Sequence, residues 1–219
     1  MRETRLVFSK EGKGVYISHL DLMRTMQRSF LRAGLRIWHT EGFNPRPYMV
    51  FALPLPVGCA SSCELVDFRL LDDISNNVLA DCLRPYCPVG ITPVHAYYPE
   101  RKFKDIKWLE MSGILEYDRE TNARTANILE ALFQRDELII KRKTKRGEGD
   151  FDLIPHVKRF QAVSQGQTLL VSLILSAQEP SINPVLITSA MNRYLGTAAP
   201  VFASFRRIRL YDADMREYR

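Results

Sequence analysis

The sequence contains no apolar run that approaches the roughly 18 residues of a membrane-spanning helix. Its first residues, from Met1 to Arg5, lead directly into a strand-like pattern instead of a signal peptide. The Walker loop, the GxGxxG fingerprint and the GxSxG elbow are also missing. These absences predict a cytoplasmic protein without a membrane partner, and they exclude the commonest sites for nucleotide binding and serine hydrolysis.

Cysteine is scarce, with four residues in the whole chain. The iron–sulfur cluster of radical S-adenosylmethionine enzymes needs three thiolates in the pattern CxxxCxxC. Cys59 and Cys63 supply the first gap, but Val66 occupies the third position, so the chain is not expected to be such an enzyme itself. The other cysteines and histidines have no partner at zinc-ligand spacing: Cys82, Cys87, His39, His95 and His156. We therefore expect no metal, no cofactor and reduced, mostly buried thiols.

Charge is distributed unevenly along the chain, although the net charge is only +6. Residues 1–46 carry nine basic and four acidic groups, whereas residues 47–100 carry two basic and six acidic groups. A second basic block, residues 141–160, has seven basic and three acidic groups. Such separation predicts a positive face that favours a polyanionic partner, and in the cytoplasm RNA is the leading candidate. A solvated surface without a partner is the alternative.

A helix with two different faces is predicted over residues 19–34. Ser18 followed by Asp21 fits a capping-box start. Apolar residues recur at helical spacing from Met23 to Ala33 and predict a buried face. Arginines recur every fourth residue on another face, which predicts an exposed phosphate-binding stripe: Arg24, Arg28 and Arg32.

The start of this helix also carries a titratable pair, His19 and Asp21. The exposed N–H groups of a helix start favour phosphate, which would make Ser18 and His19 nucleic-acid contacts and His19 a proton donor or acceptor. The structural alternative is that Ser18 caps the helix and Asp21 interacts with the helix dipole, while His19 only satisfies a nearby carbonyl. The sequence leaves both interpretations open.

The segment Gly42 to Pro47 combines an aromatic residue and a cation with two prolines. Phe43, Asn44 and Arg46 would suit single-stranded RNA, because the ring can stack on a base and the guanidinium can bind phosphate. The alternative is a shaped turn, since an Asn before a proline favours turn initiation.

A basic run occupies five of the six positions from residue 141 to 146. It predicts either a phosphate patch or a strand edge kept soluble by charge. The basic residues are Lys141, Arg142, Lys143, Lys145 and Arg146.

Periodicity and turn residues predict the same order of elements, βαββαβ, in both halves of the chain. In residues 1–100 the predicted elements are strand 4–9, helix 19–34, strand 36–40, strand 63–71, helix 74–85 and strand 90–98. In residues 101–219 they are strand 109–117, helix 121–134, strand 137–143, strand 168–176, helix 183–195 and strand 204–211. This repeat predicts an α+β fold of two tandem ferredoxin-like halves with antiparallel sheets.

In each half a long connection joins the second and third predicted strands, residues 41–62 and residues 144–167. Loops longer than about 12–15 residues are uncommon in compact domains unless they are functional or disordered. Both connections contain or adjoin the binding residues named above. We interpret them as paired binding loops at related positions of the two halves.

The stretch from Arg5 to Gly58 resembles the radical-SAM-linked protein family. The resemblance rests on Ser18 to Leu22, on Gly42 to Pro45 and on Leu53 to Gly58, and elsewhere on Lys145 to Pro155 and overall length. This family is a bacterial domain fused to, or encoded beside, a radical S-adenosylmethionine enzyme. The resemblance therefore implies a partner enzyme and leaves the reaction open.

These observations give one leading hypothesis and two alternatives. The leading hypothesis is a nonenzymatic RNA-binding or substrate-presenting accessory module that acts with a radical S-adenosylmethionine enzyme, without specificity for DNA. Two ferredoxin-like halves also resemble the CRISPR repeat-RNA endonucleases, in which case His19 or His39 would be the metal-independent general acid or base. Those enzymes carry a glycine-rich loop near the C-terminus, whereas Thr197 to Arg209 contains no glycine. The third hypothesis is a protein adaptor whose arginine face docks an acidic partner.

Overall fold

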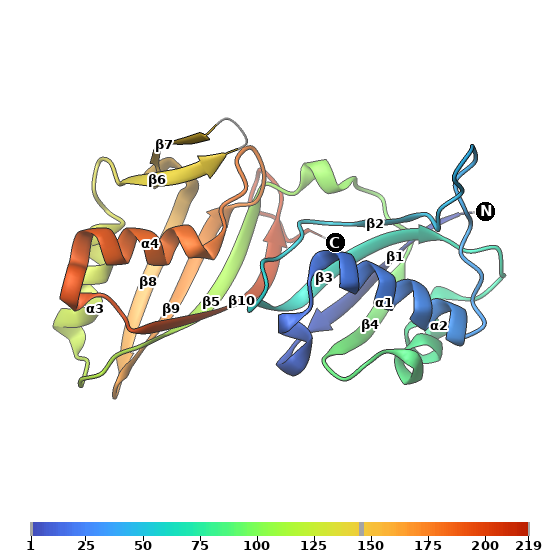
Figure 1. The fold of residues 1–219 in the computed structure, drawn as a ribbon, viewed down its shortest axis with the longest axis horizontal. Coiled ribbons are helices and arrows are strands. Elements are labelled where there is room, and N and C mark those ends of the chain that lie inside the picture. The colour runs from blue at the N-terminus through green and yellow to red at the C-terminus, as the bar shows by residue number, and fades with distance from the viewer. Residues whose placement is uncertain (1, 145–146, 219) are drawn as a thin grey trace. The chain divides into compact units, whose positions relative to one another are not determined.

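The computed structural model describes residues 2–144 and 147–218. Within these residues the chain forms two compact units, which divide between Asp105 and Ile106 and are called unit 1 and unit 2. The fold is mixed α+β, with mostly antiparallel strand pairing and, in the part described, four α-helices (Figure 1). None of these helices is long and apolar enough to cross a membrane.

Unit 1 is an antiparallel sheet with two helices on one face (Figure 1). Its elements are β1 (Glu3–Lys10), α1 (His19–Arg32), β2 (Met49–Phe51), β3 (Ala60–Arg69), α2 (Asn76–Leu83) and β4 (Ile91–Tyr97). β1 lies between β4 and β3, and the short β2 pairs with the other edge of β3.

The helix predicted over residues 19–34 is confirmed and ends at Arg32. The Ser18 hydroxyl accepts a hydrogen bond from the Asp21 backbone N–H at 3.1 Å and donates one to the Asp21 carboxylate at 2.7 Å. Met26 and Phe30 are fully buried in the core between the helices and the sheet. The apolar stripe therefore stabilises the unit and leaves the arginine stripe outside.

Unit 2 has the same order of strands in its sheet and carries a separate hairpin. Its elements are β5 (Trp108–Glu116), α3 (Ala123–Leu132), β6 (Ile139–Thr144), β7 (Gly147–Asp152), β8 (Val157–Gln165), β9 (Thr168–Ser176), α4 (Pro184–Leu195) and β10 (Phe202–Tyr211). β5 lies between β10 and β9, and β8 pairs with the other edge of β9. α3 packs against β8, and α4 packs against β6 of the hairpin.

The second strand predicted for the first half, residues 36–40, was wrong, whereas the strand predicted over residues 137–143 is confirmed but lies outside the main sheet. Residues 36–40 form only isolated bridges, and the edge strand β2 lies inside the predicted loop 41–62. Residues 137–143 give β6, which pairs with β7 instead of joining the main sheet. The edge strand β8 lies inside the predicted loop 144–167. Both edge strands give a weak sequence signal, because β2 is three residues long and the buried face of β8 has only two apolar residues, Phe160 and Ala162, between Lys158 and Ser164.

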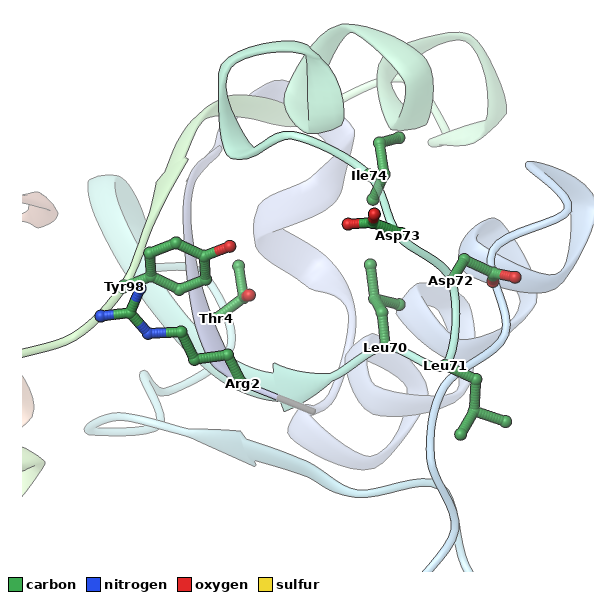
Figure 2. A pocket seen from close by; sticks show the side chains of 8 residues that line it. All are labelled: Arg2, Thr4, Leu70, Leu71, Asp72, Asp73, Ile74 and Tyr98. Carbon is green, nitrogen blue, oxygen red and sulfur yellow. The ribbon is translucent and has the colours of Figure 1, made fainter.

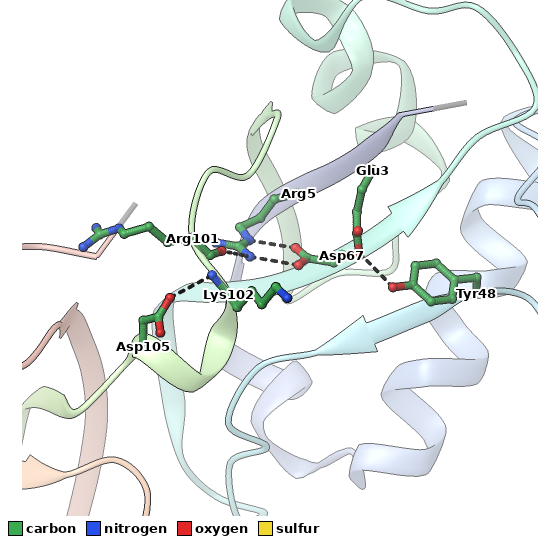
Figure 3. A network of polar contacts seen from close by, with 7 residues as sticks. All are labelled: Glu3, Arg5, Tyr48, Asp67, Arg101, Lys102 and Asp105. Carbon is green, nitrogen blue, oxygen red and sulfur yellow. Dashed lines mark hydrogen bonds and ion pairs between the residues drawn. The ribbon is translucent and has the colours of Figure 1, made fainter.

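The face of the unit 1 sheet that α1 and α2 do not cover holds a buried ion pair (Figure 3). Arg5 of β1 donates to both carboxylate oxygens of Asp67 on β3, at 2.7 and 2.8 Å. It also donates to the backbone oxygen of Arg101 at 2.9 Å, and its guanidinium lies 4.3 Å from the ring centre of Phe103. Burial raises the pKa of the Asp67 carboxyl, and the hydrogen bonds from Arg5 oppose this shift. The pair ties two strands to the segment that ends the unit.

We predict that Asp67→Asn destabilises unit 1 by about 3–5 kcal/mol, because it leaves the buried Arg5 guanidinium without its counter-charge. The two tryptophans, Trp38 and Trp108, lie one in each unit, so Trp38 fluorescence in a Trp108→Phe background would follow unit 1 in urea. The double variant Arg5→Met/Asp67→Leu should retain more stability than Asp67→Asn alone. Equal urea midpoints for Asp67→Asn and its parent would contradict the prediction.

Candidate functional site

The three side chains of the α1 arginine stripe are exposed and contribute little to the stability of the fold. Arg24 makes a loose ion pair with Asp21, 3.5 Å between nitrogen and oxygen, with both side chains 58% exposed. Arg28 and Arg32 make no hydrogen bond or ion pair with the residues that the structure describes. Exposed ion pairs contribute little to stability. These side chains are therefore available to bind anions.

His19, at the start of α1, lies against the sheet. Its ring meets Phe51 edge to face, with ring centres 5.5 Å apart and planes at 87°. It lines a narrow crevice of about 10 Å³ together with Lys10 and Glu64, two charged residues that sequence analysis missed. That volume holds about one water molecule. The crevice therefore places two charged side chains near His19 but has no room for a nucleotide.

Residues 36–48 form a hairpin that extends from unit 1 (Figure 1). His39 bridges Pro47, and the Thr40 backbone N–H donates to the Arg46 carbonyl at 2.8 Å. Gly42 has a φ of 122°, which favours glycine at the turn. At the tip the side chains of Phe43, Asn44 and Arg46 are exposed. The hairpin thus presents an aromatic ring and a guanidinium to solvent.

The base of this hairpin is held by aromatic and ionic contacts. The Trp38 and Tyr48 rings meet at 5.8 Å, and the Arg69 guanidinium lies 4.8 Å from the Tyr48 ring centre. The Tyr48 hydroxyl donates to Glu3 at 2.8 Å, as Figure 3 shows. Burial and this hydrogen bond to Glu3 raise the pKa of Tyr48. These contacts hold the base of the hairpin against the sheet, while its tip remains exposed.

The basic run on β6 is balanced by acidic residues on its own hairpin. The Lys141 ammonium lies 2.8 Å from the Asp150 carboxylate, which lowers the pKa of Asp150. Lys143 is exposed and stands opposite Glu148 in the strand register. The net positive charge on the folded hairpin is thus smaller than the basic run alone predicts.

Arg142 on β6 belongs to a stack. Its guanidinium lies 4.7 Å from the Phe151 ring centre and donates to the Ser181 carbonyl at 3.3 Å. Phe151 stacks on His156, with ring centres 5.1 Å apart. Burial and the nearby Arg142 lower the pKa of His156. Two further residues of the basic run, Lys145 and Arg146, lie outside the described residues.

The structure places the α1 stripe and the 36–48 hairpin in unit 1 and the β6 run in unit 2. Within residues 2–144 and 147–218 there is no cluster of three or more side chains able to hold a metal ion. The four cysteines are free thiols, and of these Cys59 is buried and Cys82 is exposed.

Comparison with solved structures shows where this fold recurs. A chain in the "Crystal Structure of a Cbf5-Nop10-Gar1 Complex" has a TM-score of 0.53 and 10% identity, with 94% of this chain and 48% of that chain covered. A chain in the "Structure of H/ACA RNP bound to a substrate RNA containing 2'-deoxyuridine" has a TM-score of 0.50 and 10% identity, with 98% and 49% covered. This chain thus spans about half the length of either chain, and at this identity the likeness concerns the fold alone.

Comparison by sequence gives a family. No curated protein matches the chain. The family described as "Uncharacterized protein conserved in bacteria (DUF2344)" matches residues 3–184. Because this match covers most of the 219 residues, the chain belongs to that bacterial family.

Proposed function

We propose that this protein is a nonenzymatic RNA-binding module that presents its RNA to a radical S-adenosylmethionine enzyme. The proposal rests on a set of exposed side chains in unit 1 that make few contacts with the rest of the described protein. Arg28 and Arg32 are exposed on one helix face without partners in the described part of the chain, and Phe43 and Arg46 are exposed at the tip of an anchored hairpin. Arginines bind phosphate and exposed rings stack on unpaired bases, which together favour single-stranded RNA.

Other polar groups extend this proposed surface. Arg24 adds a third guanidinium to the stripe, and Asn44 adds an amide beside Phe43. Ser18 and His19 would contact phosphate at the start of α1, although both also serve the fold there. In unit 2, Lys141, Arg142 and Lys143 would contribute weaker contacts, since their charge is partly balanced. Lys145 and Arg146 would continue the same run.

The architecture supports two ferredoxin-like halves, which we propose as residues 1–100 and 101–219. In each unit the first strand lies between the last and the third, and the second strand flanks the third. In unit 2 the β6–β7 hairpin is inserted before the edge strand β8. The H/ACA structure with a related fold is described as bound to a substrate RNA, which is compatible with an RNA-related role here.

The partner enzyme is proposed from the family resemblance of residues 5–58. A module that binds RNA through a helix face and a hairpin would position a substrate without contributing to the chemistry itself. The radical enzyme would then supply the reaction. In this account the two proteins act on one RNA, in the cytoplasm.

We predict that Arg28→Gln/Arg32→Gln weakens RNA binding and leaves folding intact. Removing two phosphate contacts should flatten the slope of log K against log salt by about 1.4 for a single strand. Exposed substitutions usually change stability by no more than about 0.5 kcal/mol each. Fluorescence anisotropy with a labelled single-stranded RNA, repeated over a salt series, would measure both affinity and slope.

The matched control is Arg124→Gln/Arg193→Gln, which removes the same charge from exposed positions on α3 and α4. It should leave the slope nearly unchanged. Equal slopes for the two double variants would mean that net charge, and not the α1 stripe, attracts the RNA.

We also predict that Phe43→Ala lowers RNA affinity by about 1–3 kcal/mol, the typical contribution of one base–aromatic stack. Phe43→Trp should retain binding, because the larger ring can still stack. Phe202→Ala removes another exposed aromatic side chain, at the start of β10, and should have no effect. Unchanged affinity in Phe43→Ala at constant salt would contradict a stacking role for the hairpin tip.

The same assays separate the alternatives. RNA cleavage by the wild-type protein that disappears in His19→Ala would support an endoribonuclease, with Lys10 and Glu64 as neighbours of His19. Absence of RNA binding together with capture of the radical enzyme that is lost in Arg28→Gln/Arg32→Gln would support a protein adaptor.

A further inference from the structure

Unit 1 contains a pocket of about 420 Å³ that neither the α1 stripe nor the hairpin uses (Figure 2). It is formed by the start of β1, the connection between β3 and α2, and the end of β4. The lining residues are Arg2, Thr4, Leu70, Leu71, Asp72, Asp73, Ile74 and Tyr98. The volume is within the range of about 300–1,000 Å³ that is typical of small-molecule sites.

Three oxygen-bearing side chains converge on this pocket. Figure 2 shows the Asp73 carboxylate and the Tyr98 hydroxyl on opposite sides of the pocket, each directed toward the other, with Thr4 beside Tyr98. Asp73 makes no hydrogen bond or ion pair with the residues that the structure describes. An unpaired carboxylate in a concave site favours a cationic ligand.

The neighbouring carboxylate is already occupied. Asp72 accepts hydrogen bonds from the Arg36 backbone N–H at 2.6 Å and from its guanidinium at 2.7 and 2.9 Å. These hydrogen bonds lower the pKa of Asp72. Figure 2 shows its side chain directed away from the Asp73 carboxylate. Asp73 is therefore the carboxylate of this pocket that has no ion-pair partner among the residues described.

The remaining groups limit the shape of the ligand. Leu70 and Ile74 provide an apolar wall beside the oxygens. The Arg2 guanidinium lies 4.1 Å from the ring centre of Tyr98 and makes the other end of the pocket positive. A primary ammonium group has three N–H donors, which match the carboxylate and the two hydroxyl groups. An attached alkyl chain would contact the apolar wall.

We propose that this pocket binds a small primary amine, with its ammonium group held by Asp73, Thr4 and Tyr98 and its alkyl stem against Leu70 and Ile74. The ligand is either a simple alkylamine or diamine, or an amino acid whose carboxylate meets Arg2. The proposal is independent of RNA binding, because none of these residues belongs to the surface assigned to RNA.

Isothermal titration calorimetry of the full chain with 1,5-diaminopentane tests the proposal. Binding should be measurable below about 10 mM, and Asp73→Asn should weaken it about tenfold or more, as expected for loss of a charge-assisted hydrogen bond. Asp118→Asn, an exposed carboxylate of unit 2 without a partner in the described residues, should leave it unchanged. The hexamethylated diamine, which has no N–H donor, should bind about tenfold more weakly.

A second titration identifies the source of the amine. L-Leucine should bind more tightly than n-pentylamine, and lose that advantage in Arg2→Gln, if the ligand is an amino acid. The reverse order would assign the pocket to alkylamines. Amide NMR spectra would confirm that each variant is folded. Absence of binding by all of these amines at about 10 mM, or equal affinity in the wild type and Asp73→Asn, would overturn the proposal.

Discussion

The buried ion pair between Arg5 and Asp67 is the interaction on which the geometry of unit 1 depends. A guanidinium taken out of water must meet a counter-charge in good geometry, so only one register of β1 against β3 can satisfy it. Side chains two residues apart share a face of a strand. The register that pairs Arg5 with Asp67 therefore also places Glu3 opposite Arg69, where Tyr48 joins them at the base of the hairpin.

Unit 1 separates the residues that stabilise it from those that are free to bind. α1 uses its apolar stripe for the core and needs only Ser18 and Asp21 for its start. The hairpin uses Trp38 and Tyr48 for its base. The arginine stripe and Phe43 then have no role in folding that the structure reveals. This cationic helix face and exposed ring are the features on which we base the proposal of an RNA ligand.

Local patterns in the sequence predicted some features well. The capped start and apolar stripe of α1 were readable because both depend on residues close together in the chain. The same is true of α4, where Asn183 caps the helix and Pro184 begins it. The edge strands β2 and β8 were missed, since neither has a continuous apolar face.

Features that depend on distant residues could not be predicted. The basic run on β6 was counted as a patch because Asp150 and Glu148 become its neighbours only when β7 folds back on β6. The crevice beside His19 and the pocket lined by Thr4, Asp73 and Tyr98 each combine separate segments. The sequence thus predicted side chains that would bind RNA, but it could not predict which of them lie beside acidic residues in the folded protein.

In the proposed function, RNA contacts unit 1 through α1 and the 36–48 hairpin. Ultraviolet crosslinking in cells, followed by mass spectrometry of the nucleotide-modified peptides, tests it most directly. We expect nucleotide adducts on the peptide that contains Phe43 and on peptides of α1, and the same adducts in cells that lack the proposed partner enzyme. Crosslinks confined to residues outside 18–46, or a complete lack of RNA adducts in cells that express the protein, would contradict the account.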